Sequence, residues 1–365
     1  MIRLRRGVVT AVGVARPGAV ELEVVLEGRA EAALAYPELV GPVAIGDTVV
    51  LNATAVELGL GTGGTHFVVA VEGRDTVDTA GSGQVMKGRY LPHQVAVSSV
   101  EETHRDLLEG SKGLRHTPVV CAPLHSMLAS VAAGAKRAGA GCRIVYVMTD
   151  GAALAGGFSR LVPRLLEAGL LDGWITCGQA FGGQLEAVTV WTGLLAAIEI
   201  LHAEVIVVAD GPGNLGTDTT WGVSALGGGN VLNAAHTLGG KPVPALRMSF
   251  ADERNRHNGL SHHSLTILRD VCKVEVNVPI PSLSDEAQRT AIWDALRAAK
   301  LEDMHHLVEV DGQPALDELH DRGVKVSSMG RAMEQDRAFW LASGAAGVLA
   351  GRLSATNEKW RSPTT

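Results

Sequence analysis

Short apolar runs alternate with longer mixed segments from residue 116 onward, and one run is clearer than the rest. Residues 205–209 are apolar and rich in β-branched valine, which predicts a strand buried on both faces. Asp210 ends the run, the glycine-rich stretch 211–216 follows, and Thr217 begins a series of helix N-cap residue types. Open α/β sheets build ligand pockets from this order of strand, turn and helix N-terminus. We therefore expect a pocket at this turn.

Further apolar runs in the same region predict more strands, and helical patterns separate most of them. The predicted strands are 119–121, 142–148, 174–177, 205–209, 243–250, 274–278, 307–310 and 324–327. The predicted helices are 158–168, 185–202, 285–299, 314–322 and 332–349, with others beginning near Ser126, Val223 and Ser261. Such alternation implies a parallel sheet with right-handed crossovers. The sequence predicts a doubly wound, mainly parallel α/β domain, and a closed (β/α)8-like barrel is the alternative.

The first 73 residues have a different pattern. Five short segments rich in Val or Ala are separated by Gly or Pro: 7–14, 20–26, 30–35, 48–55 and 65–71. They predict a small closed β-barrel of the SH3-like or OB-like type. We expect this small β-barrel, with connecting strands at 85–90 and 94–100, to occupy residues 1–100. The α/β domain is then expected over 101–354, and a polar C-terminal tail over 355–365.

Composition narrows the function classes. The formal net charge of −7 argues against a nucleic-acid or anionic-membrane partner, because either requires a basic face. The most apolar region, 188–208, is interrupted by charged residues and does not predict a membrane span. Four widely spaced cysteines without a CxxC pair, and no recognisable signal peptide, predict reduced thiols and a cytoplasmic location. Aromatic residues are only 4% of the chain, so we expect the barrel to be a lid or an oligomerisation module rather than an oligonucleotide binder.

The carboxyl ends of parallel strands meet at one rim, and this rule selects the candidate site residues. The candidate catalytic residues carry imidazole or carboxylate groups: His125, Asp150, Asp210, His257, His262 and His263. The candidate ligand-binding residues are small, polar or cationic: Gly211, Gly213, Asn214, Gly216, Thr217, Arg254, Ser261 and Arg331. The two arginines among them would neutralise an anionic group of a ligand.

The turn at 211–216 reads GPGNLG and formally matches GxGxxG. The match is weak evidence for a dinucleotide site, because the turn follows the fourth strand and the acid expected roughly 20 residues later is absent. A local turn that serves a smaller ligand, with Mg²⁺ held by Asp210 as the conceivable cofactor, is one interpretation. A tight connection without a ligand is the other.

The segment 254–266, RNRHNGLSHHSLT, contains three histidines within seven residues. Ser261 is expected to cap a helix whose first turn carries His262 and His263, where the dipole keeps imidazoles neutral. Neutral imidazoles suit acid–base, hydrogen-bonding or metal-ligand roles. Because neighbours on a helix point about 100° apart, at most one of this pair is expected to face a given ligand. For zinc, His257, His262 and Asp252 could supply ligands, although HExxH and paired-Cys patterns are missing.

Four strings together resemble an uncharacterised bacterial family, domain of unknown function 3866. They are GRYLPHQ at 88–94, DGPGNLGT at 210–217, GLSHHSLT at 259–266 and SMGR at 328–331. The resemblance covers nearly the whole chain and implies a cytosolic bacterial protein. It supplies no catalytic residue to carry over.

Two functions remain open from the sequence. The first is an enzyme that uses His/Asp acid–base chemistry on a small polar or phosphorylated metabolite, bound between the barrel and the carboxyl ends of the α/β strands. The alternative is a non-catalytic ligand-binding sensor or scaffold. In either case we expect a small-molecule ligand and a homo-oligomer.

Overall fold

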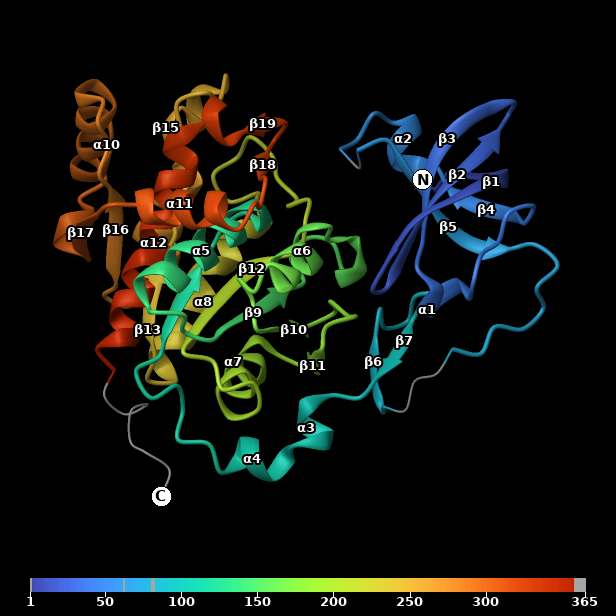
Figure 1. The fold of residues 1–365 in the computed structure, drawn as a ribbon, viewed down its shortest axis with the longest axis horizontal. Coiled ribbons are helices and arrows are strands. Elements are labelled where there is room, and N and C mark those ends of the chain that lie inside the picture. Colours follow the sequence, from blue (N-terminus) through green and yellow to red (C-terminus); the bar gives the residue numbers. More distant parts are fainter. Residues whose placement is uncertain (1, 62, 80–82, 358–365) are drawn as a thin grey trace.

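The computed structural model describes residues 2–61, 63–79 and 83–357, and shows a small barrel beside a larger α/β domain (Figure 1). The barrel is closed, with strand order β1-β2-β3-β5-β4 and β4 pairing back onto β1. Its strands are β1 (Leu4–Arg16), β2 (Ala19–Leu26), β3 (Arg29–Ala35), β4 (Thr48–Asn52) and β5 (Thr65–Val71). Two short helices, α1 (Pro37–Val40) and α2 (Thr54–Glu57), lie in its connections. The predicted five-stranded barrel is therefore confirmed, with the fourth strand ending three residues earlier than expected.

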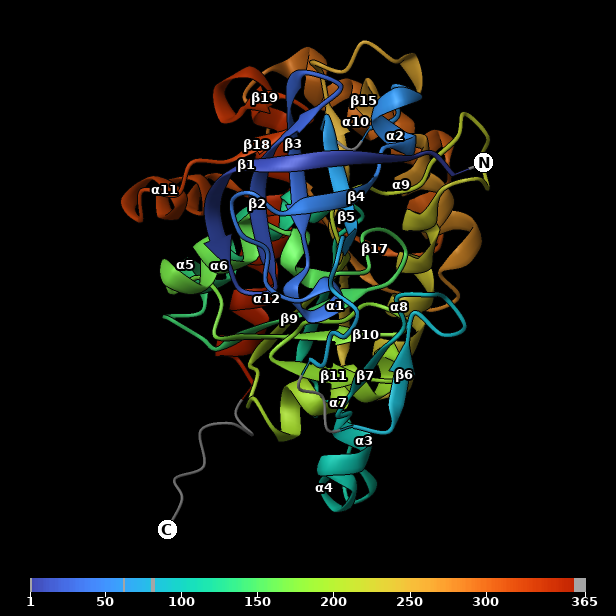
Figure 2. The ribbon, with the colours of Figure 1, turned by 90° about the vertical axis from the view of Figure 1, so that its right-hand side faces the viewer.

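Alternation of side chains fills the barrel. On β2, Leu22 and Val24 point inward and are buried, and Val49 and Leu51 of β4 join them in the same cluster. This core is small and aliphatic, as the low aromatic content of the chain requires. Figure 2 shows the barrel in front of the α/β domain, on the side where that domain is hollowed by the cavity described below.

The α/β domain is built on a six-stranded sheet with every neighbouring pair parallel, in the order β11-β10-β9-β12-β8-β13. Its strands are β8 (Pro118–Cys121), β9 (Ile144–Thr149), β10 (Gly173–Cys177), β11 (Leu185–Ala187), β12 (Val205–Asp210) and β13 (Lys241–Pro244). The sheet is open, with β11 and β13 at its edges. The doubly wound α/β fold is confirmed, and the (β/α)8-like alternative is wrong.

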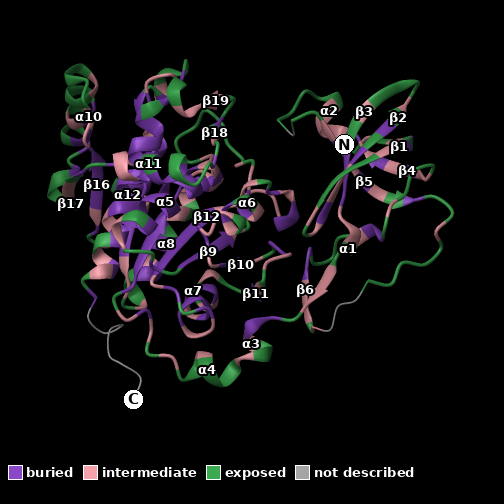
Figure 3. Ribbon diagram, in the orientation of Figure 1, coloured by how far each residue is buried: buried purple, intermediate pink, exposed green. Residues whose placement is uncertain are grey.

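Helices cover both faces of this sheet, and the strands are buried between them (Figure 3). The longer helices of the domain are α5 (Leu128–Ala138), α6 (Leu161–Glu167), α7 (Val190–Glu199), α8 (Gly227–Thr237), α10 (Glu286–Ala298), α11 (Gln313–Asp321) and α12 (Arg337–Ala355). Of these, α11 packs against α5 and α12, and α10 lies beside residues 259–260. Alternate residues of β12 enter different cores: Val207 packs in the cluster that contains α5 and α12, and Val208 in the cluster that contains α7 and α8. None of the helices in the described ranges is both long and apolar enough to cross a bilayer.

The connections that leave β8 and β12 diverge, and this creates a crevice between two neighbouring strands. After β8 the chain passes to α5 on one face of the sheet, and after β12 it passes to α8 on the other face. Ligands of open α/β sheets bind at such a switch point. Here the Asn214 side chain donates a hydrogen bond to the Pro123 carbonyl oxygen (2.8 Å), which ties the two diverging loops together.

Several predicted strands do not join the main sheet. The run 243–250 divides into β13 and β14 (Met248–Ser249), which pairs with β15 (Gly259–Leu260). The sixth and seventh predicted strands form a separate parallel pair, β16 (Asn277–Pro281) with β17 (His306–Val310). Prolines at 279 and 281 leave β16 short of N–H donors, which suits a strand paired on one side only. The eighth predicted strand is one arm of a short hairpin, β18 (Ser327–Ser328) with β19 (Arg331–Ala332).

The predicted helices are mostly present with shorter bounds. The segment predicted as helix 185–202 begins with β11, and α7 starts only after the Thr189 N-cap. Three-residue 3₁₀ turns precede α6, α8 and α12, which moves each start later than expected. The predicted domain boundaries at 100 and 354 stay predictions, and residues 358–365 of the predicted tail lie outside the described residues.

A hairpin and two short helices connect the barrel to the α/β domain. They are β6 (Val85–Lys87), β7 (Val95–Val97), α3 (Val100–Thr103) and α4 (Arg105–Glu109). The side chain of Lys87 in this hairpin is buried and pairs with Glu186 of β11. The connecting hairpin is thus fastened to the sheet of the second domain.

Candidate functional site

A cavity of about 840 Å³ lies between the barrel and the α/β domain. Its barrel side comes from β2 and β3, with Leu22 and Ala32–Leu34 in the wall. On the α/β side it is lined by the loops after β8 and β12, by the segment that carries His257 and His263, and by residues 325–329. The glycine turn and the histidine segment therefore open onto one hollow, at the switch point of the sheet.

Direct contacts hold the barrel over this cavity. Arg16 Nε donates to the Gly157 carbonyl oxygen (2.8 Å), and Arg160 Nε donates to Glu21 Oε1 (2.7 Å). The main chains of Gly18 and Gly157 approach so closely that a Cβ on Gly157 would lie 2.6 Å from the Gly18 carbonyl carbon. The barrel thus closes one side of the cavity through a backbone contact that only glycine permits.

The wall of the cavity is strongly cationic, although the whole chain carries a net charge of −7. Among the described residues that line it, Glu21 is the only carboxylate. The cationic residues that line it are Arg16, Arg160, Arg164, Arg247, Arg254, Arg256 and Lys325. Such a wall attracts anions and repels cations.

One buried carboxylate is shared by three guanidinium groups. Asp252 Oδ2 lies 3.2 Å from Arg247, 2.7 Å from Arg254 and 3.8 Å from Arg331. The hydrogen bond from Arg254 holds the pKa of Asp252 well below its usual range. Arg331 has a second carboxylate, Asp336, at 3.3 Å. Arg247 is buried, and its Nε has no hydrogen-bond partner among the described residues.

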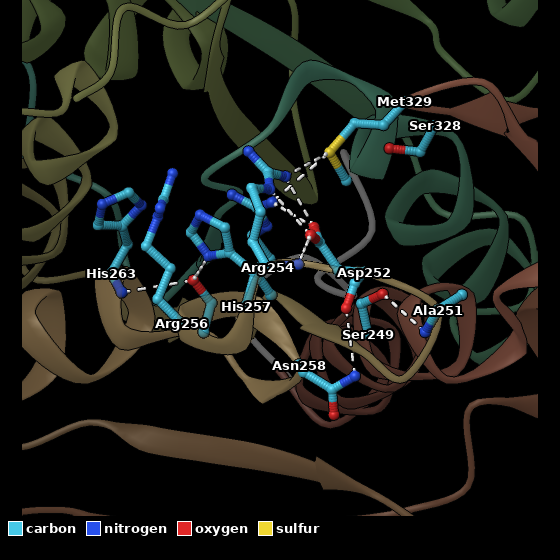
Figure 4. A network of polar contacts seen from close by, with 12 residues as sticks. Ser249, Ala251, Asp252, Arg254, Arg256, His257, Asn258, His263, Ser328 and Met329 are labelled. Atoms are coloured by element: carbon cyan, nitrogen blue, oxygen red, sulfur yellow. Dashed lines mark hydrogen bonds and ion pairs between the residues drawn. The ribbon is translucent and has the colours of Figure 1, made fainter. Parts of the chain in front are cut away.

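Three imidazoles gather beside these arginines. His257 ends a 3₁₀ turn, and His262 and His263 begin α9 (His262–Thr266). Ser261 caps α9 by accepting a hydrogen bond from the His263 backbone N–H, as the sequence predicted, and its Oγ also lies 2.8 Å from His257 Nδ1. Figure 4 shows the side chains of His263, Arg256, His257 and Arg254 projecting to the same side of the segment that carries them.

The rings of the two adjacent histidines are closer than their spacing on a helix suggests. Their centroids are 3.9 Å apart, and one nitrogen from each of His257, His262 and His263 lies within 4.8 Å of the others. Of this pair, His263 lines the cavity, whereas His262 is behind it. Both rings nevertheless reach a common point from the first turn of α9.

Burial and nearby cations favour the neutral form of all three imidazoles by lowering the pKa of each ring. Burial, assisted by Arg247, lowers the pKa of His257 to about 3, and burial together with His262 and Arg247 lowers the pKa of His263 to about 4. The pKa of His262 is lowered by burial and by Arg256. These pKa shifts have the direction that the sequence predicted, with burial as the largest cause.

His125 also lines the cavity, yet both of its ring nitrogens are engaged. Its Nε2 lies 2.8 Å from Ser159 Oγ, and its Nδ1 lies 3.2 Å from the Tyr146 hydroxyl. Ser159 Oγ already accepts backbone N–H groups of α6, so its hydroxyl proton is free to donate to His125. Burial lowers the pKa of His125 to about 4. These bonds suit a residue that braces the wall.

Neither of the two candidate aspartates is among the residues that line the cavity, and Asp150 is exposed. Asp210 Oδ1 accepts from Thr149 Oγ1 (2.6 Å) and from the Gly151 N–H (3.0 Å), and burial raises the pKa of Asp210. Asp150 Oδ2 accepts from the Gln179 N–H (2.8 Å). In the described ranges, the grouping of three or more potential metal ligands is the histidine one, so Mg²⁺ at Asp210 gains no support.

Most of the glycine turn lines the cavity, namely Gly213, Asn214, Gly216 and Thr217. Gly211 faces inward, where a Cβ would lie 2.6 Å from the Ala153 carbonyl oxygen. No helix starts directly after the turn. Residues 217–223 form a loop, and α8 begins only at Gly227. A dinucleotide fingerprint requires that helix, so the weak GxGxxG match is not supported.

Sequence reasoning found the histidines and Arg254 but missed most of the cations. Arg256 stands in the same RNRH string and could have been included. Arg16 belongs to the barrel, and Arg164 and Lys325 meet only because Arg164 donates to the Lys325 carbonyl oxygen (2.7 Å) across 161 residues of sequence. No local signal marks such residues.

These features define the class of the protein: a two-domain α/β protein with a cationic cavity at the switch point of its sheet. The chain belongs to the family described as a protein of unknown function (DUF3866), whose profile matches residues 32–347, from β3 into α12. The resemblance seen in the sequence is thereby confirmed. No curated protein matches the chain.

Proposed function

We propose that the protein is an enzyme that acts on a small anionic metabolite, phosphorylated or carboxylated, bound in the cavity between its two domains. The observation that supports this best is the surplus of guanidinium groups around Asp252. Three arginines share that carboxylate, and the buried Nε of Arg247 has no partner within the described part of the chain. An unpaired buried donor is costly, and an anion in the cavity would satisfy it.

The charge balance elsewhere in the wall agrees with an anionic ligand. Arg16 and Arg160 both pair with the single carboxylate of Glu21. Arg164 and Lys325 add further positive charge at the same wall. The volume of the cavity falls within the range of about 300–1,000 Å³ typical of small-molecule sites, so a metabolite fits better than a polymer.

The imidazoles of His257 and His263 are the groups that we assign to the chemistry, because both face the cavity beside the arginines. Neutral imidazoles can accept a proton from a bound substrate. Asp150 and Asp210 are assigned to hold the loops after their strands, since their carboxylates are bonded to the main chain.

The free, buried thiols of the four cysteines agree with a cytoplasmic location.

Binding is tested first with inorganic phosphate, pyrophosphate, sugar phosphates and nucleotides, by thermal shift and then by calorimetry. Arg254→Gln should weaken the best ligand by at least about tenfold, because one charge-assisted hydrogen bond is lost. Arg297→Gln is the matched control, since Arg297 is exposed on α10 and pairs only locally with Asp294. Equal affinities in wild type and Arg254→Gln would contradict the proposal.

A turnover measurement distinguishes an enzyme from a non-catalytic ligand-binding sensor or scaffold. Each confirmed ligand is incubated with protein and followed by NMR for new signals. Consumption that depends on His263, lost in His263→Asn while binding persists, supports an enzyme. Tight binding without any conversion would favour a ligand-binding sensor or scaffold. Light scattering of the same samples tests the expectation that the protein forms a homo-oligomer.

A further inference from the structure

We propose that His257, His262 and His263 together form a binding site for one divalent transition-metal ion of the zinc, cobalt or nickel type. The inference rests on the positions of the three imidazoles and holds whatever metabolite occupies the cavity. One nitrogen from each ring lies within 4.8 Å of the other two. A tetrahedral ion with metal–nitrogen bonds of about 2.1 Å needs ligand nitrogens about 3.4 Å apart, a distance that small side-chain rotations provide.

Two ring nitrogens of this cluster have no hydrogen-bond partner among the described residues. The Nε2 atoms of His262 and His263 are buried and lack a hydrogen-bond partner in residues 2–61, 63–79 and 83–357. The His263 side chain is 5% exposed. Leaving a buried polar nitrogen unpaired costs about 1–3 kcal/mol, and this structure does so twice at adjacent positions. A metal ion would satisfy both atoms at once.

The third ligand is held in position by its neighbour. Ser261 Oγ lies 2.8 Å from His257 Nδ1, which leaves Nε2 of that ring for the metal. Metal-binding histidines commonly use their second nitrogen in this way, because the bond fixes the tautomer and the ring orientation. Ser261 is also the N-cap of α9, so one side chain orients His257 and anchors the backbone of His263.

The ligand types select the metal. Imidazole nitrogen suits zinc, cobalt, nickel and copper, whereas Mg²⁺ and Ca²⁺ require oxygen ligands, and the cluster contains no carboxylate. Three protein ligands leave a coordination position open, as in catalytic zinc sites. His257 and His263 line the cavity, so that position would face the proposed ligand. A bound ion would supply a Lewis acid, and its water of lowered pKa would accept the substrate proton in place of the His257 and His263 nitrogens that the ion engages.

The nearby arginines oppose the binding of a cation, and carboxylates offset part of their charge. Arg247 and Arg254 are held by Asp252, and Arg256 pairs with Asp218 at 2.6 Å. An anion bound in the cavity would lie between the metal and the arginines and would offset both charges.

The experiment measures metal binding alone. Protein stripped with a chelator and dialysed is titrated with Zn²⁺ by calorimetry, and with Co²⁺ by visible absorption. We expect one ion per chain and the intense absorption bands of four-coordinate Co²⁺, without the thiolate charge-transfer bands that a cysteine ligand would produce. His262→Gln should weaken binding by at least about 100-fold. His306→Gln is the matched control, because His306 is exposed on β17.

Each outcome decides the question. Unchanged Zn²⁺ affinity in His262→Gln, or no saturable binding by the wild type, would overturn the metal site. Circular dichroism checks that the variant folds, and His257→Gln must show the same loss if His262→Gln does not fold. Phosphate binding measured in the presence of the chelator tests the cavity independently, so failure of the metal site and failure of the proposed function are distinguishable.

Discussion

The Nζ atom of Lys87 lies 2.6 Å from Oε2 of Glu186, although the two residues are 99 positions apart in the chain. Lys87 is 1% exposed and also donates to the carbonyl oxygens of Thr176 and Ala180. Glu186 accepts in addition from Thr176 Oγ1 and from the Gly182 N–H. One buried ion pair thus joins the hairpin that follows the barrel to the edge of the parallel sheet.

Removal of the Lys87 charge should destabilise the folded protein. We expect Lys87→Met to lower the free energy of unfolding by about 3–5 kcal/mol, because Glu186 would remain buried without its counter-charge. Urea unfolding followed by circular dichroism measures the change. Arg297→Met is the control, since Arg297 and its partner Asp294 are both exposed on α10, and this variant should lose less than about 1 kcal/mol. Similar losses of unfolding free energy in the two variants would show that the buried ion pair contributes no more than an exposed one.

Replacement of Asp252 should lower the stability of the free protein and increase its stabilisation by phosphate. Asp252→Asn should destabilise the free protein by more than about 2 kcal/mol, because three arginines then repel each other without their acid. The same variant should gain more thermal stability from added phosphate than the wild type does, since the anion replaces the lost charge. Asp270→Asn, which removes an exposed partner of Arg269, should change neither quantity. An equal phosphate response in Asp252→Asn and wild type contradicts the prediction.

Acid should weaken the protein partly through His125. The pKa of His125 in the folded protein is about 4, below the ordinary value of about 6.5. Between these pH values the imidazole is protonated in the unfolded chain and neutral in the folded protein. The neutral imidazole therefore contributes to the free energy of unfolding fully above about pH 6.5. This contribution, at most roughly 3 kcal/mol, is lost as the pH falls through 4.

His125→Asn removes this titration while an amide remains to bond Ser159. The unfolding free energy of the variant should therefore fall less than that of the wild type between pH 7 and pH 5, as measured by urea titrations at each pH. Parallel pH profiles would show that the imidazole is equally basic in both states.

The backbone contact between the domains can be tested with one methyl group. Gly157→Ala places a Cβ 2.6 Å from the Gly18 carbonyl carbon, so the barrel must move away from the α/β domain. We expect faster proteolysis between β5 and β6, and at least about tenfold weaker ligand binding in the cavity. Gly227→Ala is the control, because a Cβ there meets no atom within 4 Å. Equal proteolysis rates would mean that the domains dock without this contact.

The strongly patterned parts of the fold were predictable from the sequence. The run at 205–209 became the centre of β12, between β9 and β8, because β-branched residues that are apolar on both faces have few other places to pack. The five barrel strands were found from their spacing and turns. By contrast, β16 and β17 have the same local pattern as sheet strands, and only their tertiary partners show that they pair apart from the main sheet.

The site was predictable where local chemistry is dense. His257 and His263 were found because three imidazoles occur within seven residues, and the structure places two of them at the cavity wall. Asp210 was included because it ends a buried strand, but the Thr149 hydroxyl and the Gly151 N–H occupy its carboxylate. Arg16 and Arg160 reach the site only through the docking of two domains, which no short-range pattern records.

The position of Arg16 on the barrel and of Arg247 on the α/β domain, at one cavity, has a thermodynamic consequence. A molecule that touches both would act as a tether, because the barrel could not open without breaking contacts on the other side. Two cooperative units that melt separately in the empty protein should then melt as one when the cavity is filled, and differential scanning calorimetry would show two peaks merging into one.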